Sequence, residues 1–113
     1  KYLENLYKRL SKSVVGSDRL WMTLAAYNVG LGHLEDARIL TEKHGYNPNY
    51  WSDVKKHLPL LRIKKYYKKT KYGYARGLEP VRYVERIQTY LDLIYENKKA
   101  HLASFAFKKI FNN

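Results

Sequence analysis

Apolar residues recur at intervals of three and four along most of the chain, and this spacing constrains the fold more than any other feature of the sequence. Such a period places the apolar side chains on one face of a helix, and no stretch shows the alternation that is typical of a half-buried strand. Glycine and proline interrupt the pattern, so most of the expected helices are short. The sequence predicts an all-α fold of 113 residues, which form a single domain or a piece of one.

Capping residues, glycines and a proline indicate where the helices of the first half begin and end. The boundaries that they predict are an end near Ser11, a start capped by Ser17 and Asp18, a break at Gly30, an end at Gly45 and a stop at Pro59.

The second half contains an irregular segment and the longest helical pattern. Residues 62–77 carry seven basic side chains among four tyrosines and are broken by two glycines, so a basic, tyrosine-rich loop is expected there. Pro80 suits the first position of a long amphipathic helix that runs to Ile94. A further helical segment, residues 98–111, is expected at the periphery of the molecule.

The charge of +12 predicts attraction to polyanions, whether nucleic acid, anionic lipid headgroups or the acidic bacterial cell wall. The 12 tyrosines favour a polymer-binding groove, because their rings stack on sugars or bases and their hydroxyls form hydrogen bonds. Cysteine is absent and the four histidines lack the paired spacing of metal ligands, so neither a metal nor another cofactor is expected. No apolar run approaches the ~20 residues that span a bilayer.

The most distinctive segment is residues 24–32, in which two alanines precede Tyr27 and Asn28, and Gly30 and Gly32 follow. Two interpretations are open from the residues alone. In the first, Tyr27 is buried and Asn28 satisfies free carbonyls at a helix end. In the second, both side chains line a functional site at a close junction of two helices, where the backbone turns sharply.

This Ala-Tyr-Asn-x-Gly-x-Gly pattern, followed by Ala37 and Leu40, resembles the third signature block of lytic transglycosylases of the soluble, goose-lysozyme-like type. Residues 72–87 resemble the C-terminal tyrosine motif of the same family, and residues 53–55 and 58–61 between the two blocks are also similar. The resemblance covers residues 1–95 of a single unit, 1–113, with residues 96–113 as a helical extension.

The resemblance implies a lysozyme-like helical domain with a long groove for the glycan strands of peptidoglycan. In this family a glutamate protonates the bond between N-acetylmuramic acid and N-acetylglucosamine and then closes a 1,6-anhydro ring, so a second carboxylate is dispensable. The site residues that the resemblance implies are Tyr83 beside the catalytic glutamate, Asn28 orienting the reacting sugar, Tyr27 as a wall of the pocket, and Tyr72, Tyr74 and Arg76 along the groove.

The block that carries the catalytic glutamate is expected upstream of Lys1, because none of the chain's glutamates stands in the family's Glu-Ser context. The resemblance therefore implies that this chain is inactive alone and pairs with the N-terminal part of the catalytic domain. It also implies a periplasmic protein that is associated with the outer membrane.

Two other hypotheses remain open. The basic composition permits a helical nucleic-acid-binding module, although no recognition-helix motif supports it and no nucleic acid partner is expected under the first hypothesis. In addition, Phe105, Phe107 and Phe111 stand beside lysines, which indicates a helix that contacts an anionic membrane surface or a partner. This last contact is compatible with the transglycosylase hypothesis.

Overall fold

The computed structural model describes residues 2–111, and every regular element within that range is a helix. The elements are α1 (Tyr2–Arg9), α2 (Gly16–Val29), α3 (Leu31–Lys43), α4 (Trp51–Val54), the 3₁₀ helix η1 (Leu58–Arg62), α5 (Lys64–Tyr67) and α6 (Leu78–Phe111). The predicted all-α class is confirmed, and the architecture is consistent with the lysozyme-like fold that the resemblance implies.

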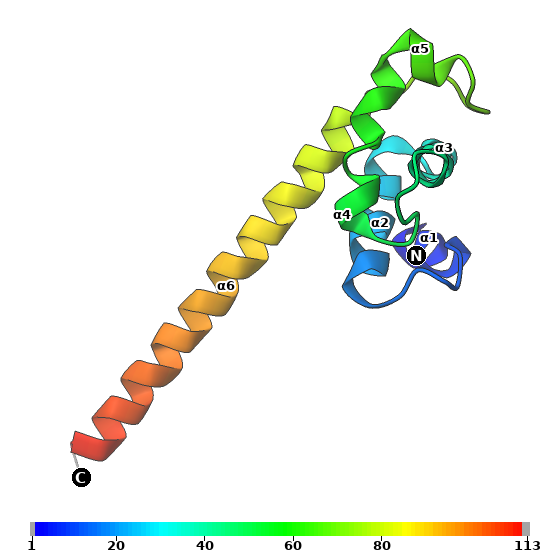
Figure 1. Cartoon of the computed structure of the whole chain (residues 1–113). Coiled ribbons are helices and arrows are strands. Elements are labelled where there is room, and N and C mark those ends of the chain that lie inside the picture. Colours follow the sequence, from blue (N-terminus) through cyan, green and yellow to red (C-terminus); the bar gives the residue numbers. More distant parts are fainter. Residues whose placement is uncertain (1, 112–113) are drawn as a thin grey trace.

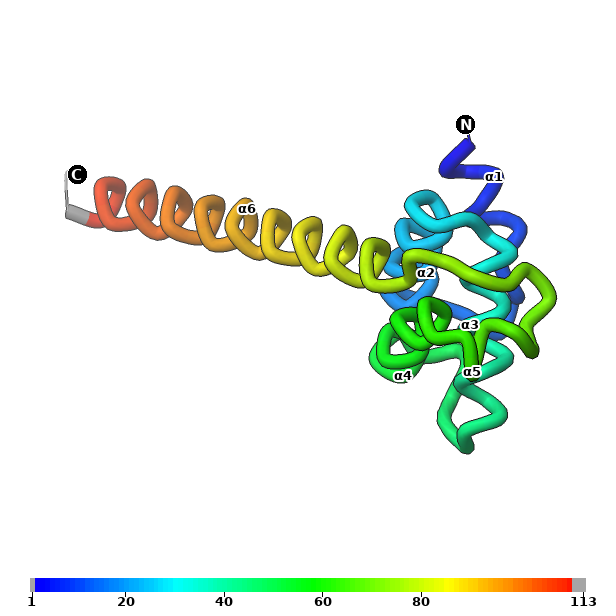
Figure 2. Tube along the Cα trace, turned by 90° about the horizontal axis from the view of Figure 1, so that it is seen from above, coloured from blue at the N-terminus to red at the C-terminus, as the bar shows by residue number. Residues whose placement is uncertain are grey.

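The molecule consists of a packed helical unit, formed by the elements from α1 to α5, and a long helix that projects from it (Figure 1). The extents of 68 × 27 × 25 Å reflect this projection. Only the first part of α6 packs against the unit, mainly against α2. Residues 89–110 are all exposed, and Figure 2 shows from above that α6 carries the C-terminal end far from α1.

The core is built from apolar side chains that nearly every helix contributes, and each of them is almost completely buried. Its most buried members include Leu6 of α1, Met22 of α2, Leu34 of α3, Val54 of α4, Leu58 of η1 and Val84 of α6. Burial of each such side chain stabilises the fold by roughly 1.5–3 kcal/mol. The core therefore fixes the start of α6 against α2 and η1.

Three of the predicted boundaries are confirmed. Helix α1 ends at Arg9, close to Ser11, and α2 ends at Val29, directly before the break at Gly30. Gly45 adopts a φ of 86° after α3, and its N–H donates to the carbonyl of Glu42. This is the conformation that glycine allows at low cost at a helix end.

The predicted cap of α2 is wrong. The helix begins at Gly16, its N-cap is Val15, and no side chain forms a capping hydrogen bond. The carboxylate of Asp18 instead accepts a hydrogen bond of 2.9 Å from the backbone N–H of Trp51. Asp18 therefore bonds to a distant segment instead of capping its own helix, and this hydrogen bond holds α4 against α2.

The predicted stop at Pro59 is also wrong, because this residue lies in the first turn of η1. Proline is tolerated there since the N–H that it lacks would have no partner within the helix. The expected loop of residues 62–77 contains the short helix α5, and the two helices expected after it are one continuous α6. Residues 98–111 were predicted to be helical and peripheral, and the described side chains up to Ile110 are exposed.

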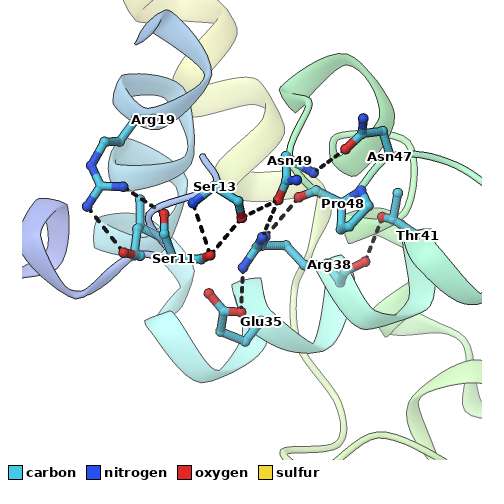
Figure 3. A network of polar contacts seen from close by, with 11 residues as sticks. Ser11, Ser13, Arg19, Glu35, Arg38, Thr41, Asn47, Pro48 and Asn49 are labelled. Carbon is cyan, nitrogen blue, oxygen red and sulfur yellow. Dashed lines mark hydrogen bonds and ion pairs between the residues drawn. The ribbon is translucent and has the colours of Figure 1, made fainter. Parts of the chain in front are cut away.

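Two arginines link the loops of the helical unit (Figure 3). The guanidinium of Arg19 donates to the carbonyls of Ser11 and Val14, at 2.8 and 2.9 Å, beyond the C-terminal end of α1. Arg38 of α3 donates to the carbonyl of Pro48 and to the side-chain oxygen of Asn49, at 2.8 and 2.7 Å. The charge-assisted bonds of Arg19 fix the segment between α1 and α2, and those of Arg38 fix the turn after α3.

Candidate functional site

Helices α2 and α3 are joined by a single residue, Gly30, whose φ is 102°. Its N–H donates to the carbonyl of Ala26, and its own carbonyl accepts from the N–H of Leu34, so it ends one helix and starts the next. A side chain is strained at this φ, and only glycine adopts it readily. The sharp turn brings the end of α2, where Asn28 lies, beside the first turn of α3.

Gly32, in the first turn of α3, allows the segment around Tyr72 to approach the helix closely. A Cβ atom at this position would lie 2.8 Å from carbons of the Tyr72 ring, so the ring rests directly against α3. The segment around Tyr72 is also held by Asp36 of α3, whose carboxylate accepts from the N–H groups of Lys71 and Tyr72 at 3.3 and 2.9 Å. The tyrosine-rich segment is thus anchored to α3.

The residues before α6 lie against η1. The N–H of Ala75 donates to the carbonyl of Leu61 at 3.1 Å, and Ala75 is buried. At Gly77 the contact is tighter still, because a Cβ atom there would lie 1.7 Å from the carbonyl oxygen of Leu58. These contacts set the position of Tyr74 and Arg76 relative to the core.

A pocket of about 480 Å³ lies between the α2–α3 junction and the segment that leads into α6, and most of its lining side chains are polar. Its lining residues are Asn28, Val29, His33, Tyr74, Ala75, Arg76 and Glu79. Three of the six predicted site residues, Asn28, Tyr74 and Arg76, are therefore brought together here from two distant parts of the sequence.

The other three predicted residues lie outside this pocket. The ring of Tyr27 is 6.0 Å from that of Tyr2, and Tyr72 lines a neighbouring pocket of about 350 Å³. Tyr83 is half-buried in the first part of α6, where it packs against the core. The roles that the resemblance implies for Tyr27, Tyr72 and Tyr83 stay predictions.

The purely structural interpretation of Tyr27 and Asn28 does not describe this helix end. Tyr27 is 51% exposed rather than buried. The side chain of Asn28 is exposed and, within residues 2–111, forms no hydrogen bond with a helix carbonyl. Neither side chain therefore completes the helix end in the way that this interpretation requires.

His33 and Glu79 line the pocket but were not predicted as site residues. The sequence favours an isolated surface position for His33, whereas its Nδ1 atom is buried and has no hydrogen-bond partner within residues 2–111. An unsatisfied buried nitrogen costs about 1–3 kcal/mol. In the sequence, the position of His33 directly after Gly32 is the feature that could have indicated a place in the site. Glu79 lies in the first turn of α6.

Residues 2–111 contain no group of three or more side chains arranged to hold a metal ion. Within the same range, no helix has the combination of length and apolar character that crossing a membrane requires.

Comparison with known proteins agrees with the site motifs. No family model matches the sequence. Membrane-bound lytic murein transglycosylase F of Shewanella halifaxensis is 55% identical over 94 residues, which are 83% of this chain and 20% of that protein. The chain is homologous to part of lytic murein transglycosylase F. The proteins of this name from Alteromonas mediterranea and Saccharophagus degradans are also 55% identical, over 81% and 87% of this chain.

The chain spans about a fifth of the length of each lytic murein transglycosylase F that it matches. The resemblance stated from the two sequence blocks is confirmed. The matches to these three proteins cover 92–98 residues, close to the length over which the resemblance was expected. The boundary at residue 95, and the assignment of residues 1–113 to one unit, stay predictions.

Proposed function

We propose that the chain is the C-terminal part of the catalytic domain of a peptidoglycan lytic transglycosylase. The parent enzyme cleaves the β-1,4 bond between N-acetylmuramic acid and N-acetylglucosamine and forms 1,6-anhydro-N-acetylmuramic acid. The observation that carries the proposal is the pocket in which Asn28, Tyr74 and Arg76 meet. The name of the curated relatives supports the same reaction class.

The chemistry of the pocket suits a saccharide that bears a carboxylate. The amide of Asn28 offers both a donor and an acceptor to sugar hydroxyl and acetamido groups. The exposed ring of Tyr74 provides an apolar face for stacking against a pyranose ring, and the exposed guanidinium of Arg76 pairs with the lactyl carboxylate of the sugar. His33 contributes a further polar residue to the lining of the pocket.

The proton donor of this reaction is a glutamate that protonates the bridging oxygen and then accepts a proton from the muramic 6-hydroxyl. We place it in the N-terminal part of the catalytic domain, so this chain alone is inactive. Of the chain's glutamates, only Glu79 lines the pocket of Asn28, and it stands at a helix start outside the Glu-Ser context. An acidic residue there is explained by the helix dipole.

Binding to purified murein sacculi tests this proposal on the chain itself. We expect the chain to pellet with sacculi, and the double variant Tyr74→Ala/Arg76→Gln to bind about tenfold more weakly, because it loses a stacking ring and a charge-assisted bond. The measurement is the fraction of protein that pellets as a function of sacculus concentration.

The matched control is Tyr90→Ala/Arg86→Gln, which removes the same two residue types from exposed positions of α6. This variant should bind sacculi as the unchanged chain does. Equal weakening by both pairs would contradict the assignment of the pocket. Salt-sensitive binding to duplex DNA without affinity for sacculi would instead favour the nucleic-acid-binding module.

We also propose that the far part of α6 contacts an anionic membrane surface, in agreement with a location in the periplasm beside the outer membrane. Residues 97–111 contain four lysines and no acidic residue. Leu102, Phe105, Phe107 and Ile110 are all exposed in this part of the helix. Exposed apolar and basic side chains on one helix are typical of segments that bind lipid headgroups.

Vesicle flotation tests this contact. We expect the chain to float with vesicles that contain anionic lipid, and Leu102→Ser/Phe105→Ser to reduce the floated fraction several-fold, because burial of each apolar side chain contributes about 1.5–3 kcal/mol. Leu20→Ser, at an exposed position of α2, is the control and should change little. Flotation that is insensitive to the α6 variant would argue against this surface.

A further inference from the structure

A second pocket, of about 650 Å³, is larger than the pocket of Asn28. It is formed by the C-terminal half of α3, by α5 and by the segment that follows α5. Its lining residues are Asp36, Ile39, Leu40, Lys43, His44, Lys65, Tyr66, Lys69, Thr70 and Lys71. The two pockets share no lining residue, so this one is a separate feature of the surface.

The lining of this pocket, which we call the lysine pocket, is strongly cationic. Lys43 comes from α3, Lys65 from α5, and Lys69 and Lys71 from the segment after α5. The ion pairs found within residues 2–111 involve none of these four lysines. Cations that converge on one hollow raise the local potential and attract an anion, especially where the walls exclude water.

The single acidic lining residue does not neutralise the lysines. Asp36 is 3% exposed, and its two carboxylate oxygens accept the backbone N–H groups of Lys71 and Tyr72. Four lysines and one aspartate leave a net charge of +3 on the lining, with His44 neutral. Asp36 therefore ties the wall that bears Lys69 and Lys71 to α3. The ammonium groups of Lys65 and Lys71 lie over the rings of Tyr66 and Tyr72, at 5.5 and 5.4 Å, whereas those of Lys43 and Lys69 have no ion-pair partner within residues 2–111.

Part of the lining of the lysine pocket is apolar or aromatic. Ile39 is 52% exposed, and Leu40 and Tyr66 are half-buried beside it. The ring of Tyr66 is flanked by the ring of His44, at 6.0 Å, and by the ammonium of Lys65, at 5.5 Å, which limits its movement. A matching ligand combines negative charges at its edges with a small aliphatic body.

We propose that the lysine pocket binds a short acidic peptide, with carboxylates paired to Lys43 and Lys69 and small aliphatic side chains on Ile39, Leu40 and Tyr66. A nucleic acid strand fits less well, because its backbone needs a row of cations along an extended groove rather than a single hollow. Where the proposed function holds, the peptides attached to glycan strands supply such a ligand. The binding chemistry itself does not depend on that source.

Isothermal titration of the chain at low ionic strength with the peptide acetyl-Ala-Glu-Ala-Glu-amide tests the proposal. We expect saturable binding, accompanied by backbone amide shifts in residues 39–44 and 65–71 in NMR spectra. The same peptide with glutamine in place of both glutamates should bind about tenfold more weakly, because it keeps the aliphatic contacts and loses both charges. Equal affinity for the two peptides would overturn the proposal.

Variants separate the pocket from the overall charge of the chain. Lys43→Gln/Lys69→Gln should weaken binding of the acidic peptide about tenfold. Lys98→Gln/Lys108→Gln removes the same charge from the exposed part of α6 and should leave the affinity unchanged. Equal weakening by the two pairs would show that only net charge matters, and tighter binding of a short oligonucleotide at the same residues would show a polyphosphate site. Either result overturns the peptide assignment.

A third variant separates this proposal from the proposed function. The probe contains no sugar, so Tyr74→Ala/Arg76→Gln should keep its full affinity for the acidic peptide while it loses affinity for sacculi. If Tyr74→Ala/Arg76→Gln loses only sacculus binding, sugar binding depends on the pocket of Asn28. If only the lysine variant loses the peptide, peptide binding depends on the lysine pocket. A Tyr74→Ala/Arg76→Gln chain that loses the peptide as well would overturn the separation of the two sites.

Discussion

Replacement of Gly77 with alanine is expected to lower the free energy of unfolding by about 3 kcal/mol or more, because the added methyl group collides with backbone atoms. The new Cβ would lie 1.7 Å from the carbonyl oxygen of Leu58 and 2.5 Å from its carbonyl carbon. A flexible side chain could move aside, but η1 is held to the core by buried Leu58 and Leu61. Either η1 or the start of α6 must shift.

Urea unfolding followed by circular dichroism measures this loss, and Gly16→Ala is the matched control. Gly16 has a φ of 59° and open space around it, so alanine there is expected to cost only about 1 kcal/mol through backbone strain. If Gly77→Ala costs no more than Gly16→Ala, the close contact of the segment before α6 with η1 is not present in solution.

The local parts of the fold were predictable from the sequence, and the parts that depend on distant contacts were not. Gly30 and Gly45 were recognised as helix ends because their backbone conformation is a property of the residue itself. The cap expected from Asp18 failed because its carboxylate binds the backbone of Trp51, 33 residues away. The continuity of α6 was missed because a polar stretch near Lys98 interrupts the apolar face without ending the helix.

The residues of the candidate site could also be selected from the sequence, but their arrangement in space could not. Asn28, Tyr74 and Arg76 were selected through resemblance to family motifs, whereas their meeting in one pocket depends on the approach of Gly77 to Leu58. No periodicity reveals that approach. The basic character of residues 62–77 was likewise predicted, but only the fold brings Lys43 of α3 to the lysines of that segment.

Asn28→Ala, introduced into the full-length lytic transglycosylase that contains this segment, is expected to lower the rate of anhydro-muropeptide release about 100-fold. This is the loss that follows removal of one hydrogen-bond donor that is positioned for a transition state. The change in folding stability should stay within about 0.5 kcal/mol, since the side chain is exposed and supports no helix carbonyl. Chromatography of the products released from sacculi measures the rate.

Two controls decide what a loss of activity means. Asn97→Ala removes the same side chain from an exposed position of α6 and should leave the rate unchanged. Glu79→Gln removes the acidic residue that lines the pocket and should retain most of the activity if, as proposed, the proton donor lies in another part of the catalytic domain. If Glu79→Gln abolishes the reaction while Asn28→Ala spares it, the proton donor is Glu79 and the chain carries its own catalytic acid. If Asn28→Ala lowers the rate only through loss of folded protein, Asn28 is a structural residue, and the pocket then lacks the group that orients the sugar.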